Sequence, residues 1–389
     1  MSTTVTPTAA DAPSPRANGD RAASAEEGLL EPVMKVPEGA GPAVDQASTA
    51  DPRNDRADGS DASSPYGQAR FWTIPSNPVP PGARAGTLEV DGATLRYAMF
   101  KPAPAGGGRR GRGTVLLLQG RNEYIEKYFE TAGDLAARGF GVLAFDWRGQ
   151  GGSTRLLPDP QRGYVRSFRD YERDLDAIIE RVLLPDCRAP FTIVGHSMGA
   201  LIALLAAPRH ANRIERIVML GPLLRLTNQL VGPRAIAWLA GLLRVFGLGK
   251  RYAAMGARAR EVPEFLTNVL TTDRERHERN GRMLVEHHHL GLGGPTVAWV
   301  HAASLAMRRA TSERHLRTVP IPSLMIAAGD DLVVSNQAIE RTVARMRNAN
   351  VLTVYGARHE MLQERDRYRE QVLAAIDAFA ARPVEDGPV

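Results

Sequence analysis

The sequence predicts an α/β fold, in which a mostly parallel central sheet carries helices on both faces and a helical cap is inserted. Short apolar or β-branched segments at 115–118, 141–145 and 191–194 alternate with longer segments of helical period. Strands without a polar face are typical of parallel sheets that helices cover on both sides. The alternation stops between 222 and 301, where the chain is helix-prone and rich in Leu, Arg and Gly, so we place the insertion there.

Composition divides the chain into four segments. Residues 1–70 are rich in Ala, Pro, Asp, Ser and Gly, and we expect a disordered arm because such a segment buries too little surface to offset its ordering entropy. The α/β core is expected in two parts, 71–222 and 302–389, with the helical cap at 223–301 between them. Residues 1–65 contain five Lys or Arg against eleven Asp or Glu, whereas the whole chain has a net charge of +6, so the body is strongly basic.

Local signals justify the individual elements. Residues 87–100 form a predicted hairpin, because Asp91-Gly92 suits a turn that needs positive φ. A helix is expected over 124–137, with Gly139 at a left-handed cap position. A second helix opens at Ser167–Asp170, which has a capping-box pattern. Further strands are predicted at 214–220, 323–328 and 351–355.

The most specific motif is Gly195-His196-Ser197-Met198-Gly199, which joins the predicted strand 191–194 to the apolar helix 200–207. A strand that turns directly into a helix through Gly-x-Ser-x-Gly presents its serine on a strained turn. Gly195 and Gly199 let neighbouring backbone approach where a Cβ would clash. We therefore predict that Ser197 is a nucleophile beside the first peptide N–H groups of a helix, which suit a developing oxyanion.

A serine nucleophile needs a general base, and the base needs an orienting carboxylate. His359 directly follows the last predicted strand and is the predicted base. The acid is expected in the loop after the preceding strand, where Asp330 and Asp331 are adjacent. We favour Asp331, since one residue separates it from Val333-Val334 and this spacing is usual in such loops. Asp330 remains the alternative.

Two further loops border the predicted site. The backbone N–H groups of Arg121 and Met198 are the predicted oxyanion donors, because Arg121 lies in the loop after the strand 115–118. The Arg121 side chain is either solvated or available to a phosphate headgroup. Asp146 also ends a strand, but it precedes the serine in the chain. We expect it to brace the glycine-rich loop that follows it.

Composition argues against several other classes of protein. Cys187 is the single cysteine, so we expect neither a disulfide framework nor a cysteine zinc site, and a reducing cytoplasm is favoured. The run His287-His288-His289 resembles a metal-binding cluster, but three consecutive residues in regular structure do not all coordinate one ion. We assign it to a cap loop and expect no metal or other cofactor. The arginines lack interleaved aromatic residues, so no nucleic-acid partner is expected.

The segment 234–252 combines apolar residues with flanking Arg and Lys. One interpretation is a lid over an acyl tunnel that touches lipid, and the other is an amphipathic helix packed on the core. The basic body favours peripheral contact with an anionic membrane surface, with an ordinary solvated surface as the alternative. We expect a cytoplasmic protein, because no apolar run approaches the ~20 residues of a membrane span. The predicted apolar stripe consists of Ile236, Leu239, Leu243 and Phe246, with Trp238 beside it.

Four motifs taken together are more specific than any one of them, and they occupy 119–123, 146–153, 195–199 and 356–360. With these residues the chain resembles the monoacylglycerol lipase and bacterial lysophospholipase branch of the α/β-hydrolases, which are related to the serine aminopeptidase S33 hydrolases. The stretches 148–164 and 293–299 are similar to bacterial lysophospholipases in particular. The resemblance covers about residues 85–385. It departs at Gln119, where the family usually has a histidine.

The resemblance implies Ser197 as nucleophile, His359 as base, Asp331 as acid and hydrolysis of a single acyl ester on a glycerol backbone. We therefore hypothesise an enzyme that cleaves lysophospholipids or monoacylglycerols through an acyl-enzyme, without a cofactor. The enzymatic alternatives are a small-ester esterase and a serine aminopeptidase. An aminopeptidase should carry acidic cap residues to hold its substrate's amine, and 234–260 offers almost none. A protein of this fold that binds ligand without chemistry usually lacks a triad member.

Overall fold

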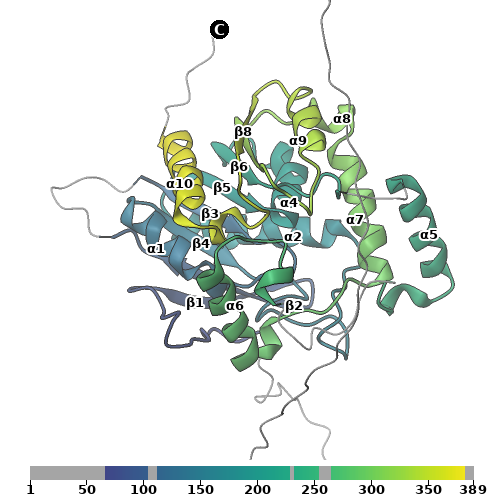
Figure 1. Cartoon of the computed structure of the whole chain (residues 1–389), viewed down its shortest axis with the longest axis horizontal. Coiled ribbons are helices and arrows are strands. Elements are labelled where there is room, and N and C mark those ends of the chain that lie inside the picture. Colours follow the sequence, from purple (N-terminus) through teal and green to yellow (C-terminus); the bar gives the residue numbers. More distant parts are fainter. Residues whose placement is uncertain (1–65, 104–111, 228–231, 254–263, 382–389) are drawn as a thin grey trace, which may run out of the picture. The chain divides into compact units, whose positions relative to one another are not determined.

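The computed structural model describes residues 66–103, 112–227, 232–253 and 264–381. These residues contain an eight-stranded sheet with the order β1-β2-β4-β3-β5-β6-β7-β8 (Figure 1). The strands from β4 to β8 in this order are parallel. The predicted α/β class is confirmed. The parallel strands are β3 Thr114–Leu118, β4 Gly141–Phe145, β5 Phe191–His196, β6 Arg216–Leu220, β7 Ser323–Ala328 and β8 Ala349–Val354.

An antiparallel hairpin forms one edge of the sheet, as predicted. Strands β1 Arg84–Val90 and β2 Ala93–Phe100 pair in register around Asp91 and Gly92, whose φ angles are 49° and 73°. The Asp-Gly pair tolerates positive φ at both turn positions, which this tight hairpin requires. Strand β2 then pairs antiparallel with β4 and so joins the hairpin to the parallel part.

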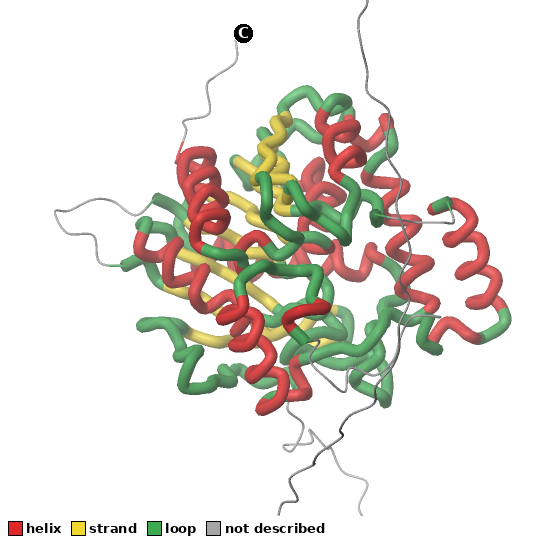
Figure 2. The backbone as a smooth tube through the Cα atoms, viewed as in Figure 1, coloured by secondary structure: helices red, strands yellow, loops and turns green. Residues whose placement is uncertain are grey.

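Helices cover both faces of the sheet (Figure 2). Successive side chains of a strand point to opposite faces, and β6 shows the consequence: Ile217 and Met219 enter one apolar core, whereas Val218 and Leu220 enter the other. The strands have no polar face because both faces are buried. The first core includes α2 Phe168–Ile178, α4 Met198–Ala206 and α9 Asn336–Val343, and the second includes α1 Phe129–Ala137 and α10 Asp366–Ala381.

The predicted signals are present at the start of α2 and at the end of α1. Ser167 Oγ accepts from the Arg169 N–H at 3.2 Å, and the Asp170 carboxylate accepts from the Ser167 N–H at 3.3 Å, which completes the capping box of α2. Gly139 follows α1 with φ 89°. The helix predicted over 124–137 begins instead with a 3₁₀ turn, Ile125–Tyr128.

The segment predicted as the cap lies between β6 and β7. Its described part contains α5 Pro233–Val245, α6 Arg274–Glu286, α7 Val297–Ala310 and α8 Glu313–Leu316. The boundary predicted at residue 301 falls inside α7. The C-terminal half of this helix packs in the first core, where Ala303, Ala306 and Ala310 are buried. Helix α7 therefore belongs to the core as much as to the cap.

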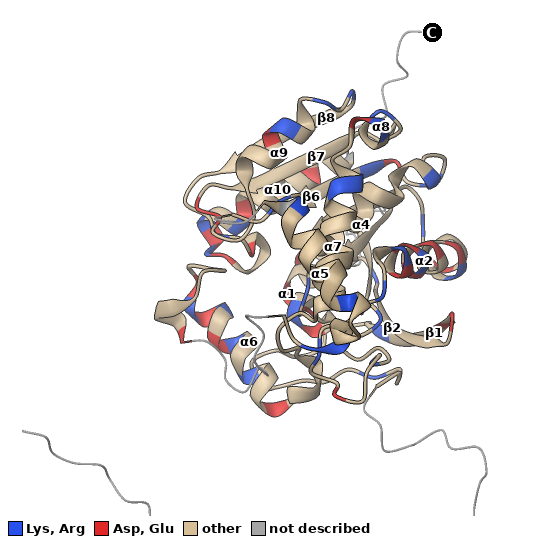
Figure 3. Cartoon of the chain, turned by 90° about the vertical axis from the view of Figure 1, so that its right-hand side faces the viewer, with Lys and Arg blue, Asp and Glu red and all other residues tan. Residues whose placement is uncertain are grey.

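Helix α5 packs on α7 through its small residues. Ala237 and Ala240 are buried, and a Cβ on Gly241 would lie only 2.9 Å from the His301 ring. Small residues allow close approach of two helices, so they select the packed face and turn the large apolar residues outward. The predicted stripe is only partly on the packed face: Ile236 and Leu243 are half-buried, whereas Leu239 is 52% exposed and Phe246 71% exposed. Figure 3 shows α5 lying over α7 on this side of the molecule.

Residues 66–70, which we expected in the arm, contact the body. The Gly67 N–H donates to the Gly152 carbonyl at 2.7 Å, and the Tyr66 ring lies edge-on to His289. Residues 1–65 lie outside the described part of the chain, so the disordered arm stays a prediction there. None of the helices in the described ranges has the length and apolar character that crossing a bilayer requires.

Candidate active site

Ser197 occupies a strained turn between β5 and α4. Its φ and ψ are 49° and −108°, outside the regions that side-chain-bearing residues prefer. The flanking glycines are needed on steric grounds. A Cβ on Gly195 would lie 2.8 Å from the Ala200 backbone, and one on Gly199 would lie 2.4 Å from the Leu118 carbonyl oxygen. The sequence Gly-x-Ser-x-Gly thus permits the tight turn that the structure contains.

His359 and Asp331 meet Ser197 at the carboxyl edge of the sheet. His359 follows β8, and its Nε2 lies 3.1 Å from Ser197 Oγ. Its Nδ1 lies 2.8 Å from Asp331 Oδ2, in the loop after β7. The structure therefore brings together the three side chains that the sequence predicts as nucleophile, base and acid. All three are buried, and Ser197 retains 9% exposure.

Asp331 rather than Asp330 is the carboxylate that faces the histidine. Asp331 Oδ1 also accepts from the N–H groups of Val333 and Val334, at 2.8 and 2.9 Å, which hold the carboxylate in place. Burial acts to raise the pKa of Asp331, but His359 and these two N–H groups outweigh it and lower the pKa below its ordinary value. Asp330 is exposed. The Asp331 carboxylate, which contacts His359, is therefore ionised at neutral pH.

The predicted oxyanion donors lie beside the elbow. The end of β3 packs directly on Gly199, so the loop that contains Arg121 borders the first turn of α4. Gln150 links the two sides, because its Oε1 accepts from the Asn122 N–H at 2.7 Å and its Nε2 lies 3.9 Å from Met198 Sδ. Within the described ranges, neither the Arg121 N–H nor the Met198 N–H donates to a protein acceptor. Arg121 and Met198 remain the predicted oxyanion donors.

The Arg121 side chain is half-buried and held by other residues, whereas one of the two interpretations of the sequence had it freely solvated. Its guanidinium lies over the Trp299 ring, 5.4 Å from the centroid, and donates to the Gly293 carbonyl. Its Nε has no hydrogen-bond partner among the described residues. Burial without a facing carboxylate lowers the pKa of Arg121 to about 10. An uncompensated positive charge thus lies beside the oxyanion loop.

A buried network behind the site was missed by the sequence analysis. The Glu123 carboxylate accepts from the Gly120 N–H and from the Tyr128 hydroxyl, the latter at 2.6 Å. Glu123 also faces His196 Nδ1 at 3.2 Å, and His196 Nε2 lies 3.1 Å from the His359 carbonyl. This network connects the oxyanion loop, the elbow and the histidine loop. The only signal in the sequence was that Glu123 ends the first of the four motifs.

Opposite charges stabilise this network. Burial acts to raise the pKa of Glu123, but His196 and Lys127 lower it well below its ordinary value. Burial likewise acts to lower the pKa of His196, and Glu123 raises it instead. Lys127 Nζ extends the network to Glu360, at 2.6 Å. The contact between Glu123 and His196 therefore favours the charged form of both groups.

Asp146 braces the glycine-rich loop, as expected. It is completely buried, and its Oδ2 accepts from the Gly152 N–H at 2.7 Å. Arg96 Nε donates to the same oxygen at 2.9 Å and the Arg96 guanidinium also pairs with Glu126. Asp146 does not contact the histidine and belongs to the support of the site. Arg96 and Glu126 were not singled out in the sequence.

The three consecutive histidines do not converge. His287 Nε2 lies 3.0 Å from the Thr73 carbonyl, and the His289 ring lies edge-on to Trp72, with the centroids 4.7 Å apart. Burial, followed by the neighbouring His287 and His288, lowers the pKa of His289 to about 4. Within the described part of the chain, no group of His, Cys, Asp and Glu side chains is arranged to hold a metal ion.

The class of the protein follows from this arrangement. A parallel sheet with a serine elbow after β5, an acid after β7 and a histidine after β8 defines an α/β-hydrolase.

Comparison with known proteins assigns the family. The family model described as serine aminopeptidase, S33 matches residues 109–366, so the chain belongs to this family and is a hydrolase. It is 33% identical to lysophospholipase L2 of Escherichia coli K12 over 304 residues, which are 75% of this chain and 86% of that protein. It is 32% identical to the probable lysophospholipase L2 of Haemophilus influenzae over 268 residues, 69% of this chain and 83% of that protein.

The fold is shared with a solved structure. A soluble variant of monoglyceride lipase from Saccharomyces cerevisiae, in complex with a substrate analogue, superposes with a TM-score of 0.60 at 21% identity. The match covers 76% of this chain and 94% of that one. This match confirms the α/β-hydrolase fold, and the family model confirms the resemblance seen in the sequence.

Proposed function

We propose that the protein is a serine hydrolase that cleaves the single acyl ester of a lysophospholipid or a monoacylglycerol. The observation that carries the reaction is the continuous chain from Ser197 Oγ through the His359 ring to Asp331, with contacts of 3.1 and 2.8 Å. A neutral imidazole held by a carboxylate on Nδ1 presents Nε2 as a base to the serine hydroxyl. No other group needs to supply the nucleophile or the proton transfer.

In the proposed reaction, Ser197 Oγ bonds to the ester carbonyl carbon while His359 Nε2 takes the hydroxyl proton. The carbonyl oxygen becomes an oxyanion that the N–H groups of Arg121 and Met198 stabilise. Collapse of this intermediate breaks the ester bond, and the departing glycerol oxygen takes the proton from His359. Water then attacks the acyl-enzyme, with His359 again acting as base, and releases the fatty acid and free Ser197.

The charge of Arg121 favours a lysophospholipid over a monoacylglycerol. Its guanidinium is largely removed from solvent and faces no carboxylate, so an anionic headgroup would supply the missing counter-charge. The names of the Escherichia coli and Haemophilus influenzae relatives support the same substrate class. A monoacylglycerol has no charge to offer and remains the second candidate, which the name of the yeast relative supports.

We further propose peripheral contact with an anionic membrane surface. Trp238 and Val245 of α5 are 70% and 83% exposed, and Phe246 at its C-terminal end is 71% exposed. Arg244 lies in the same helix. Large apolar side chains flanked by basic ones are typical of helices that lie in a lipid interface. The proposed location is the cytoplasmic side, in keeping with the single cysteine.

Replacement of Ser197 tests the reaction. The variant Ser197→Ala should keep its fold and lose labelling by a fluorophosphonate together with turnover of lysophosphatidylethanolamine. The wild type should be labelled, and His359→Ala should lose this labelling as Ser197→Ala does. Full turnover by Ser197→Ala would refute the proposed nucleophile.

A substrate screen tests the specificity. The wild type should hydrolyse lysophosphatidylethanolamine or monoolein faster than p-nitrophenyl acetate, because the acyl chain contributes binding energy. Preference for a proline anilide would instead establish an aminopeptidase. A lack of turnover on all of these substrates, with the fluorophosphonate also unreactive, would favour a protein that only binds its ligand.

A further inference from the structure

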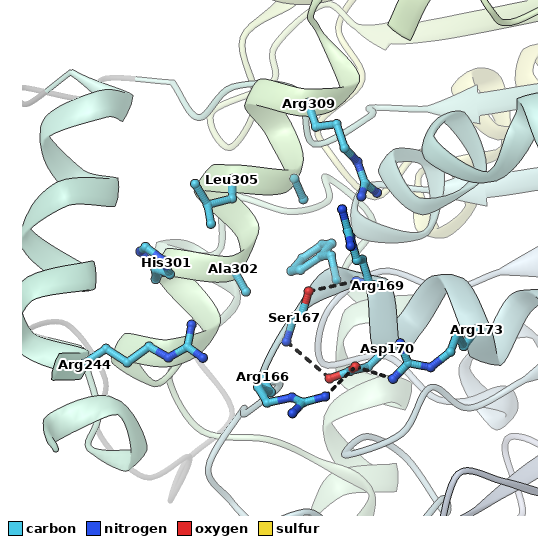
Figure 4. A pocket seen from close by; sticks show the side chains of 12 residues that line it. Arg166, Ser167, Arg169, Asp170, Arg173, Arg244, His301, Ala302, Leu305 and Arg309 are labelled. Atoms are coloured by element: carbon cyan, nitrogen blue, oxygen red, sulfur yellow. Dashed lines mark hydrogen bonds and ion pairs between the residues drawn. The ribbon is translucent and has the colours of Figure 1, made fainter.

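A cavity of about 650 Å³ lies between the N-terminal end of α2 and the pair of helices α5 and α7. Five arginines line it: Arg166 just before α2, Arg169 and Arg173 on α2, Arg244 on α5 and Arg309 on α7. We call this cavity the arginine groove. Figure 4 shows these side chains around it, with the guanidinium groups of Arg169 and Arg309 pointing toward one another. None of the lining residues belongs to the hydrogen-bonded chain of Ser197, His359 and Asp331.

The positive charge of the groove is poorly compensated. Asp170 is the one carboxylate among the described lining residues, and it is already shared. It accepts from the Ser167 N–H in the capping box and pairs with Arg173 at 2.6 Å, while Arg166 lies 3.9 Å away. The guanidinium groups of Arg169 and Arg244 have no hydrogen-bond or ion-pair acceptor in the described part of the chain. Among the described residues, these two groups therefore have no counter-charge.

Like charges also face one another in the groove. Arg309 pairs with Glu172, yet burial, followed by the positive charge of Arg169, lowers the pKa of Arg309 below its ordinary value. A bound anion between the two guanidinium groups would relieve this repulsion. The N-terminal end of α2, an eleven-residue helix, adds its partial positive charge to the same space.

We propose that the arginine groove binds a phosphate group, which belongs either to an anionic phospholipid headgroup or to a soluble phosphate ester. Guanidinium groups form paired, charge-assisted hydrogen bonds with phosphate oxygens, and the groove presents such donors from α2, α5 and α7 at once. Arg244 lies between the groove and the exposed apolar face of α5. If the ligand is a lipid headgroup, the membrane must lie on that face, with the acyl chains beside Trp238 and Phe246. The proposal does not depend on the proposed reaction.

Two double variants test the proposal in the Ser197→Ala background, where no turnover interferes. Arg169→Gln with Arg244→Gln removes the two free guanidinium groups of the groove. Arg341→Gln with Arg347→Gln is the matched control, because it removes the same charge from exposed positions on and after α9. All four side chains are exposed, so the melting temperatures should stay close to that of the parent.

Binding is measured by calorimetry with glycerol 3-phosphate and inorganic phosphate, and by co-sedimentation with vesicles of phosphatidylcholine with and without phosphatidylglycerol. Each lost charge-assisted contact should weaken binding about tenfold. Weaker binding of the soluble phosphates by the groove variant, but not by the control, identifies a soluble ester as the source. If instead only the binding to phosphatidylglycerol vesicles falls, the source is a lipid headgroup. Equal binding by the groove and control variants to every one of these probes would overturn the proposal.

Discussion

His196 Nε2 lies 3.1 Å from the backbone carbonyl oxygen of His359. His196, which directly precedes Ser197, therefore holds the loop that contains His359. The other ring nitrogen of His196 faces Glu123, which also accepts from the Gly120 N–H in the oxyanion loop. The buried contact between Glu123 and His196 therefore ties together three loops that follow different strands. Such a network sets the distances between groups that must act together.

Glu123→Gln should reverse the pH dependence that His196 contributes to stability. In the wild type, Glu123 raises the pKa of His196 in the folded state, so the associated stability is present below the unfolded pKa of about 6.5 and is lost as pH rises through the folded value. Without the carboxylate, burial lowers the pKa of His196, and stability should rise between about pH 5 and 7 instead. Urea unfolding across pH 5 to 9 measures both slopes.

Glu340→Gln, on the exposed surface of α9, is the control for this experiment and should keep the slope of the wild type. Identical slopes in Glu123→Gln and the wild type would mean that His196 is not charged by Glu123.

Asp331→Asn should lower kcat by about 10⁴-fold while Asp330→Asn has little effect. Asparagine donates where the carboxylate accepts, so it turns His359 to the tautomer that cannot take the serine proton. Steady-state hydrolysis of a lysophospholipid by the two variants makes the comparison. A larger loss in Asp330→Asn would exchange the roles of the two aspartates.

Arg121→Met should lower kcat/KM for lysophosphatidylethanolamine by about tenfold or more and leave monoolein hydrolysis nearly unchanged. The methionine keeps an apolar contact with Trp299 and the backbone N–H, but it removes the charge that we assign to the headgroup. Parallel loss on both substrates would instead show that the side chain acts by holding the segment at Gly293.

Trp238→Ser combined with Phe246→Ser should weaken binding to phospholipid vesicles without changing the melting temperature. Each side chain is about 70% exposed in the structure, so the folded protein loses little packing, whereas membrane insertion would lose about 1.5–3 kcal/mol for each. Val351→Ser on the edge strand β8 serves as the control. If vesicle binding by the double variant matches that of the control, α5 is not the membrane-facing helix.

Gly199→Ala should destabilise the fold more than Gly133→Ala. A Cβ at residue 199 would lie 2.4 Å from the Leu118 carbonyl oxygen and 2.6 Å from that of Gln119, both of them backbone atoms that cannot move aside without disturbing β3. No atom lies within 4 Å of a Cβ placed at Gly133 in α1, where alanine also favours the helix. Unfolding in urea should separate the two variants by several kcal/mol.

Patterns local in sequence determined much of this protein. Apolar strands that alternate with helices require a parallel sheet with helices on both faces. A Gly-x-Ser-x-Gly turn between a strand and a helix then places its serine at the carboxyl edge of this sheet. Chain order then predicted where His359 and the acid would follow. These inferences succeed because each depends on neighbouring residues or on the direction of parallel strands.

Tertiary structure decided the rest, because it depends on contacts between residues far apart in the chain. The choice of Asp331 over Asp330 required the position of the His359 ring, since the two aspartates are adjacent and chemically alike. The role of Glu123 depended on His196, which lies 73 residues away. The outward face of α5 was decided by the fit of Ala237 and Gly241 against α7, which no hydrophobic period along α5 reveals.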